Sequence, residues 1–183
     1  NKERVGVYLG LWQEANEHKR SAFAAIGSAL SAMAARVANA YDLQGPATTV
    51  NTACSSALVA VDAAMRDVRA GRVDYAIVGG INILASEQPF VDLKRASMLS
   101  PTARCHTFSA AADGYVRAEG GVVFLLRSTS APAPALIPRA TVIGSAVNQN
   151  SRRKPITAVD PLAQERVIRA ACEDAGVLPR DLA

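Results

Sequence analysis

Metal centres, disulfide frameworks and membrane spans need residues that this sequence has in small numbers or lacks. The 183 residues include three cysteines and two histidines, and no His/Cys group has metal-ligand spacing. Cys54, Cys105 and Cys172 lie far apart, and an odd, unpaired set argues against a disulfide framework. The apolar runs are far shorter than the roughly 20 residues that span a bilayer, and no signal-peptide pattern is present. A reducing cytoplasm and no membrane partner are therefore expected.

Aromatic residues are scarce as well, at 5% of the chain. The net charge is +4, but the basic residues are scattered and residues 151–155 form their only short cluster. Without aromatic interleaving, this cluster favours a solvated loop over a nucleic-acid surface. A mildly basic surface still suits an acidic protein partner. Because half the residues are hydrophobic, the composition is that of a globular domain with a core.

What is present is an alternation of strand and helix patterns. Strands are predicted at residues 5–11, 47–52, 74–84, 114–127 and 140–150. Helices are predicted at 22–40, from Cys54 to Gly71, at 89–98, and from Asp160-Pro161 to Gly176. The alternation predicts an α/β sheet that is largely parallel. Residues 99–114 read as a long irregular loop, a kind of segment that is often functional.

Cys54 stands where the strand pattern at 47–52 passes directly into a helical pattern. A cysteine at such a turn projects from the carboxyl edge of the sheet, where α/β proteins bind ligands. The helix N-terminus favours a thiolate, and its N–H groups can stabilise an oxyanion when a thioester is attacked. Small neighbours, Ala53, Ser55 and Ser56, permit a tight turn and an approaching acyl group. These features make Cys54 a candidate nucleophile.

The local pattern alone favours a buried core position for Cys54, because free cysteine is among the most buried residue types. Cys172 lies on the apolar face of the last predicted helix and is expected in the core. Cys105 adjoins His106 in the predicted loop, but nothing in the spacing requires a Cys–His pair. His18, in a polar stretch, is expected at the surface. The local pattern leaves both interpretations of Cys54 open.

Longer stretches of the sequence favour the nucleophile over the buried cysteine. Residues 45–61 closely resemble the active-site segment of β-ketoacyl synthases. The resemblance is to the ketosynthase domains of modular type I polyketide synthases, and it runs in order over nearly the whole chain. Further matching stretches are residues 75–84, 94–101, 104–126, 143–150 and 161–182. This ordered series is far more specific than the motif around one cysteine.

The resemblance implies the thiolase fold, an α/β fold with layers in the order α/β/α/β/α, present here incompletely. Most of an N-terminal half is expected at residues 1–126, a connector at 127–139 and the start of a C-terminal half at 140–183. It also implies a dimer through the strand at about residues 47–52. Met98 is expected near the acyl pocket and the dimer interface.

The resemblance further implies that Cys54 takes an acyl chain from an acyl carrier protein as a thioester, with its backbone N–H in the oxyanion hole. A malonyl-type extender would then undergo decarboxylative condensation with that thioester. No cofactor is expected in the domain itself, because the substrates are carried on the phosphopantetheine arm of the carrier. Neighbouring acyltransferase or other synthase domains are expected partners.

The chain also departs from the family pattern. Asn51 and Ser109 stand where aspartate is common, and Ala118 where glycine is frequent. The two family histidines are expected beyond Ala183, so the 183 residues alone are expected to be inactive. A fatty-acid elongating synthase remains an alternative. So does a non-condensing domain that holds or gates acyl chains.

Overall fold

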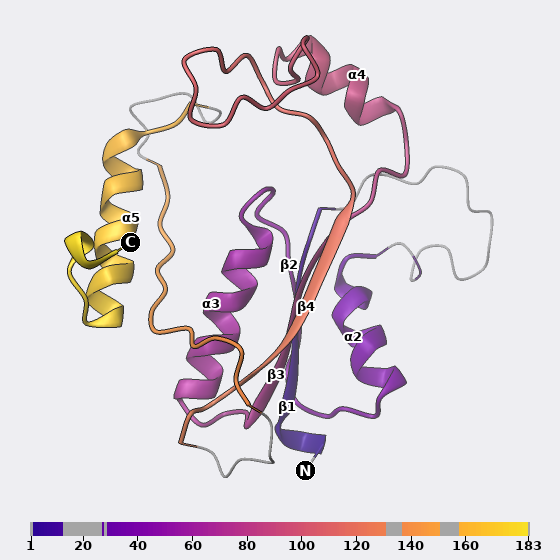
Figure 1. Cartoon of the computed structure of the whole chain (residues 1–183). Helices are drawn as coiled ribbons and strands as arrows, with labels where there is room; N and C mark the ends of the chain where they lie inside the picture. Colours follow the sequence, from indigo (N-terminus) through magenta and orange to yellow (C-terminus); the bar gives the residue numbers. More distant parts are fainter. Residues whose placement is uncertain (1, 13–26, 28, 131–136, 151–157, 183) are drawn as a thin grey trace. The chain divides into compact units, whose positions relative to one another are not determined.

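The computed structural model describes residues 2–12, 27, 29–130, 137–150 and 158–182, in two compact units. The first unit, Asn1–Ser128, contains η1 (Lys2–Arg4), β1 (Val5–Leu11), α2 (Ser31–Ala40), β2 (Ala47–Val50), α3 (Ser56–Arg69), β3 (Tyr75–Asn82), α4 (Gln88–Arg95) and β4 (Gly120–Arg127) (Figure 1). The second unit, Thr129–Ala183, contains α5 (Pro161–Ala175) and η2 (Pro179–Asp181).

The first unit is built on a four-stranded sheet in the order β2-β1-β3-β4. β1 pairs in parallel with both β2 and β3, as the alternating pattern predicts. β4 differs, because it pairs antiparallel with β3 along its full length. α2 and α3 lie on opposite faces of this sheet (Figure 1), so its central strands are covered on both sides.

Two apolar clusters attach these helices to the sheet. Tyr8 and Val78 pack with the alanine-rich face of α3. Val7 and Leu9 pack with Ala34 and its neighbours on the other face. Successive side chains of a strand point to opposite faces, and β1 therefore supplies both clusters. This explains why the strand reads as an almost unbroken apolar run.

Local signals set the helix ends as the sequence predicts. The Asp160 side chain accepts the N–H of Leu162 at 3.1 Å, and Pro161 is the first residue of α5. Gly176 ends that helix with φ +68°, in the left-handed region that glycine adopts without strain. Gly71, just after α3, has the same φ. The predicted start of the helix at 22–26 lies outside the described residues.

Residues 140–150 form no strand in the described part of the second unit, so this prediction is wrong for this chain. A strand needs a hydrogen-bonded neighbour, and none pairs with this segment among the described residues. It lies instead along α5, where the N–H of Ser145 donates to Asp174 at 2.9 Å and the Asn148 amide donates to the carbonyl of Ala163 at 2.8 Å. The division into 1–126, 127–139 and 140–183 stays a prediction.

Tyr8 links the core to α3 through a partly buried hydrogen bond. Its hydroxyl, in a residue only 2% exposed, donates to the carboxylate of Asp67, which also accepts from Arg72. Burial and this bond raise the pKa of Tyr8 above its usual value. Burial acts to raise the pKa of Asp67 too, but the hydrogen bonds from Tyr8 and Arg72 outweigh it and hold that pKa low.

Tyr8→Phe is expected to lower the free energy of unfolding by about 1–2 kcal/mol near neutral pH, because Asp67 loses a buried donor. The raised pKa of Tyr8 stabilises the folded state fully below about pH 10, and this contribution is lost as pH rises further. Urea unfolding at neutral and alkaline pH tests both effects. If the phenylalanine variant loses stability at alkaline pH as steeply as the unsubstituted protein, the hydrogen bond of Tyr8 does not contribute to stability as predicted.

Candidate active site

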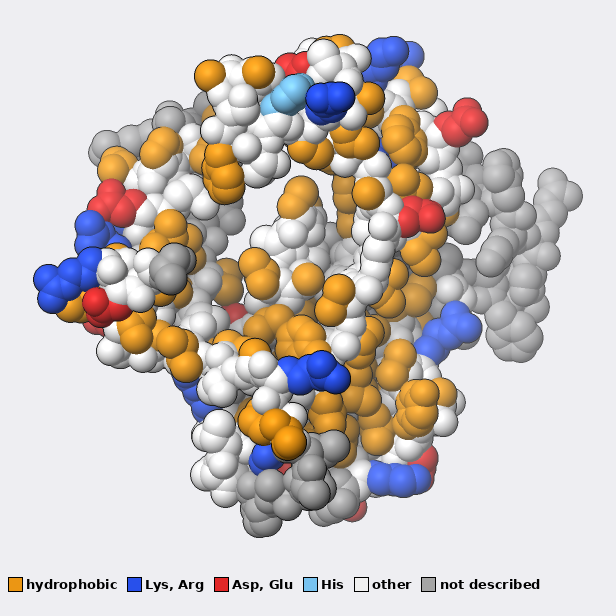
Figure 2. All heavy atoms as spheres, in the orientation of Figure 1, with side chains coloured by type: hydrophobic (Ala, Val, Ile, Leu, Met, Phe, Trp, Pro, Cys, Tyr) orange, Lys and Arg blue, Asp and Glu red, His pale blue; other side chains and the backbone are white. Residues whose placement is uncertain are grey.

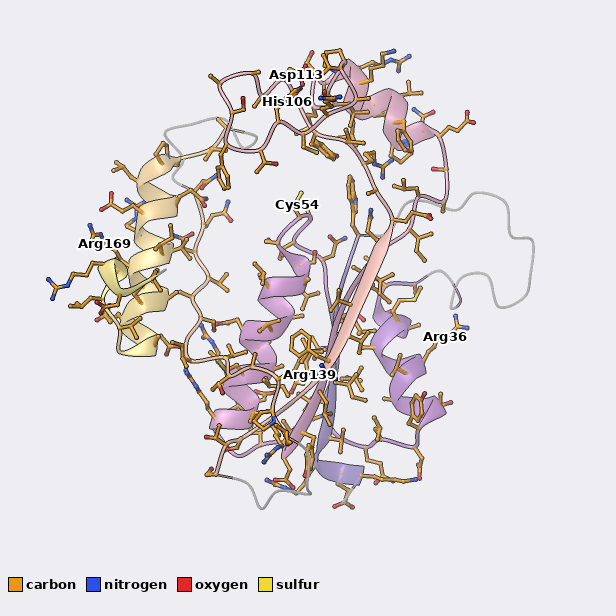
Figure 3. The ribbon with its side chains drawn as sticks, viewed as in Figure 1. Arg36, Cys54, His106, Asp113, Arg139 and Arg169 are labelled. Carbon is orange, nitrogen blue, oxygen red and sulfur yellow. The ribbon has the colours of Figure 1, made fainter. Side chains whose placement is uncertain are left out.

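Cys54 lies in the turn between β2 and α3, at the edge of the sheet where the parallel strands end. Its side chain is exposed, as Figure 3 shows at the N-terminal tip of α3. The strand–turn–helix geometry expected from the sequence is therefore present. An exposed thiol at a helix N-terminus is accessible to substrate and lies where the helix dipole favours a negative charge.

Hydrogen bonds from side chains hold the turn before Cys54. Ala53 has φ +56°, a left-handed conformation that is strained for a residue with a side chain. The side-chain oxygen of Asn51 accepts the N–H of Ala53 at 3.2 Å. The buried hydroxyl of Ser56 accepts the N–H of Thr52 at 2.9 Å and donates to the carbonyl of Ala53 at 2.6 Å. These bonds define the direction in which the chain presents Cys54.

Asn51, one of the departures from the family pattern, keeps the acceptor that this turn needs. An amide oxygen accepts a backbone N–H as a carboxylate oxygen does. Ser55 adds a further bond, since its hydroxyl lies 2.8 Å from the Thr52 hydroxyl and donates to the Thr52 carbonyl at 2.9 Å. The turn is thus fully assembled without an aspartate at residue 51.

A cavity of about 590 Å³ opens beside Cys54 within the first unit. Its walls come from the ends of β1 and β3, the first turns of α3, and the segment that leads into β4. Side chains on these walls include Leu11, Trp12, Leu58, Val61, Val78, Tyr115, Val116, Arg117, Val122 and Phe124. Hydrophobic side chains gather where α3 and β4 lie in Figure 2. An apolar cavity of this size is typical of a small-molecule site.

Tyr115 and Arg117 bring the polar groups of this cavity wall. Burial raises the pKa of Tyr115, the nearby Arg117 cation opposes that effect, and the charge of Cys54 adds to it. The phenol therefore lies within electrostatic range of the thiol. Arg117 is buried, with its guanidinium over the rings of Trp12 and Phe90. Neither residue was singled out from the sequence, although both follow the predicted functional loop.

His106 and Asp113 form a separate group on the loop between α4 and β4 (Figure 3). The Thr102 hydroxyl donates to Asp113 at 2.9 Å and lies 3.3 Å from the Nε2 atom of His106. A hydrogen bond from Ser100 is the main reason that the pKa of Asp113 lies below its usual value. Among the described residues, no hydrogen bond joins His106 to Cys54, and a Cys–His pair is not formed.

The remaining residues noted in the sequence have structural positions. Cys172 is buried on α5, as expected, whereas Cys105 is exposed and its sulfur accepts the N–H of Val116 at 3.3 Å. Met98 is 39% exposed and does not line the cavity, but its carbonyl accepts the N–H of Tyr115, which does. The acyl-pocket role of Met98 stays a prediction. His18 lies outside the described residues.

Metal centres and membrane-spanning helices are the other features that could point to a function. No group of three or more His, Cys, Asp or Glu could hold a metal ion in the described part of the chain. Within the same residues, no helix is long and apolar enough to cross a membrane. The turn of Cys54 and its cavity are the candidate site for chemistry.

An exposed cysteine in a strand–turn–helix beside an apolar cavity indicates an α/β protein with a site suited to nucleophilic catalysis. Residues 1–131 match the model of the β-ketoacyl synthase N-terminal domain, and the chain belongs to this family. A solved oxazolomycin ketosynthase domain from Streptomyces albus superimposes with a TM-score of 0.88 at 34% identity, over 98% of this chain and 33% of that chain. These matches confirm the expected family and the thiolase-like fold.

The curated relatives that the chain resembles are polyketide synthases. It is 39% identical over 183 residues to the phenolphthiocerol synthesis polyketide synthase type I Pks15/1 of Mycobacterium bovis, covering 97% of this chain and 9% of that protein. It is 45% identical over 153 residues to the spectinabilin polyketide synthase system protein NorA' of Streptomyces orinoci, covering 83% and 4%. The chain thus spans less than a tenth of these relatives.

Proposed function

We propose that this chain is the acyl-accepting part of a polyketide ketosynthase and that Cys54 is its nucleophile. The observation that carries the proposal is the exposed thiol of Cys54 on a hydrogen-bonded turn at the N-terminus of α3, beside an apolar cavity. An apolar cavity next to a nucleophile suits an aliphatic acyl chain, because burial removes the chain from water.

The reaction begins with attack of the Cys54 thiolate on the carbonyl carbon of an acyl thioester. A new C–S bond forms, the bond to the carrier sulfur breaks, and the carrier thiolate takes up a proton. The backbone N–H of Cys54 donates to the oxyanion in the tetrahedral intermediate. A malonyl-type extender then loses carbon dioxide, and its carbanion attacks the Cys54 thioester. The extended chain leaves on the second carrier, and the thiolate of Cys54 is regenerated.

The partners follow from this chemistry and from the relatives. Thioester substrates arrive on the phosphopantetheine arm of an acyl carrier protein, so the domain itself requires no bound cofactor. Acyltransferase or other synthase domains adjoin the ketosynthase in the proposed parent protein. Because β2 is an edge strand of the sheet that the described residues form, its outer edge supports a homodimer through residues 47–52.

Acyl transfer is tested by incubating the full-length protein with an acyl-loaded carrier and mapping the acyl group by peptide mass spectrometry. The added mass is expected on the peptide that contains Cys54. Mass on a peptide containing Cys105 or Cys172, or on no cysteine, would show that the proposed nucleophile is wrong. Condensation is scored separately, by supplying a malonyl-loaded carrier and looking for the β-ketoacyl product.

A further inference from the structure

Arg117 is a charged residue that the proposed reaction does not use, although it lies in the wall of the Cys54 cavity. Its exposed fraction is only 8%. The guanidinium carbon lies 5.4 Å from the centroid of the Trp12 ring and 4.5 Å from that of Phe90. Both distances fall within the roughly 6 Å range of cation–π attraction, which strengthens when the cation is removed from water.

The two rings come from separate parts of the first unit. Trp12 directly follows β1, Phe90 belongs to α4, and Arg117 precedes β4. A planar guanidinium can stack on aromatic faces, whereas the compact, hydrated ammonium of lysine cannot do so in the same way. The contacts of Arg117 therefore join three segments that are far apart in the sequence.

Hydrogen bonds hold the same segment on either side of Arg117. The N–H of Tyr115 donates to the carbonyl of Met98 at 3.0 Å. The carboxylate of Glu119 accepts the N–H of Leu84 at 2.8 Å. Residues 115–119 are thus fixed at both ends by hydrogen bonds and in the middle by the stacked cation. Val116 and Ala118 are also hydrogen-bonded, to the Cys105 sulfur at 3.3 Å and to the Asn82 amide at 2.6 Å. Arg117 adds the packing of this segment on the two rings, and that packing is lost without it.

The position of this wall matters for Cys54, because Tyr115 and Arg117 line the same cavity as the thiol. The charge of Cys54 and that of Arg117 act in opposite directions on the pKa of Tyr115. Both groups therefore lie within electrostatic range of the Tyr115 phenol. A chain bound to the sulfur and directed into the cavity would contact residues 115–118, which line it.

We propose that Arg117 is a positioning residue that fixes residues 115–118 as a wall of the Cys54 cavity and thereby favours the loading of extended aliphatic acyl chains over short ones. The inference rests on the proposed function, since it takes Cys54 as the acyl acceptor. A reagent that reaches only the sulfur makes no use of this wall. A long acyl chain gains its binding from apolar contacts along the wall.

The test compares Arg117→Met and Arg117→Lys in the full-length protein with a matched control, Arg36→Met. Arg36 is an exposed arginine on α2, and Figure 3 shows it away from Cys54. Peptide mass spectrometry gives the rate of Cys54 modification by iodoacetamide and by the acetyl and octanoyl thioesters of N-acetylcysteamine. Phe90→Leu removes one aromatic face of the stack and serves as a second, milder variant.

Octanoyl loading is expected to fall about tenfold in Arg117→Met, because a small displacement of a positioning group has a large effect on rate. Alkylation by iodoacetamide should stay within about twofold, since the thiolate sets that rate. Acetyl loading should change less than octanoyl loading, Arg117→Lys should recover part of the loss, and Phe90→Leu should shift the ratio in the same direction. Arg36→Met should match the unsubstituted protein.

Equal losses with all three reagents would show a general structural defect and would overturn the inference. An unchanged ratio of octanoyl to acetyl loading would overturn it as well. If Arg117→Met does not fold, the ratio of octanoyl to acetyl loading is measured in Phe90→Leu instead, and an unchanged ratio there overturns the inference. If no thioester loads Cys54 of the unsubstituted protein although iodoacetamide reacts with it, the proposed function fails and the inference fails with it.

Discussion

Cys54→Ala is expected to abolish acyl loading, leaving less than about one thousandth of the rate of the unsubstituted protein. Alanine has no atom that can form the covalent thioester. Cys54→Ser is expected to load far more slowly than cysteine, because the reactive species is an anion and a serine hydroxyl stays protonated near neutral pH. The rate is measured with an acyl-loaded carrier and peptide mass spectrometry.

Cys105→Ser is the matched control for this substitution. Cys105 is also an exposed cysteine, and a serine oxygen can still accept the N–H of Val116. Loading in this variant should equal that of the unsubstituted protein. Persistent acylation of Cys54→Ala, or loss of acylation in Cys105→Ser, would show that Cys54 is not the nucleophile.

Gly10→Ala is expected to be the most damaging of the small substitutions in the sheet. A Cβ atom at this position would lie 2.3 Å from the backbone nitrogen of Ala57 and 2.4 Å from the carbonyl carbon of Ser56. These atoms belong to the first turn of α3, which cannot shift without moving the turn of Cys54. A loss of about 3 kcal/mol in the free energy of unfolding is expected from this overpacking, together with slower loading of Cys54.

Gly120→Ala provides the control for Gly10→Ala, because a Cβ atom at residue 120 meets no atom within 4 Å. The two variants make the same chemical change in strands of one sheet. In urea unfolding, the free energies of unfolding of the two variants should differ by the full cost of the clash, with Gly120→Ala close to the unsubstituted protein. Similar midpoints for the two variants would show that α3 does not depend on close contact at Gly10.

The periodic elements were predictable because their signals are local. β1 is buried on both faces and reads as a continuous apolar run, and α3 carries its apolar residues at helical spacing. Asp160, Pro161 and Gly176 mark the ends of α5 through their own backbone and side-chain chemistry. Such features depend on neighbours in the sequence and need no tertiary information.

The sequence-based predictions fail where a segment's structure depends on the strand that it pairs with. Residues 140–150 have strand-like composition, but a strand exists only with a paired neighbour, and none is present among the described residues. The antiparallel direction of β4 is likewise set by its pairing with β3. Strand composition carries no signal for direction, since the same side chains alternate between faces in both arrangements.

The sequence by itself determined Cys54 as the candidate nucleophile. The strand that passes into a helix at this cysteine made the role possible, and the ordered resemblance to β-ketoacyl synthases over nearly the whole chain decided for it. Only the tertiary structure decided that this thiol is exposed and which groups surround it. Trp12, Phe90 and Arg117 are far apart in the chain and meet only after the sheet has brought their segments together. Contacts of this kind depend on the relative positions of folded elements, and local sequence does not encode them residue by residue.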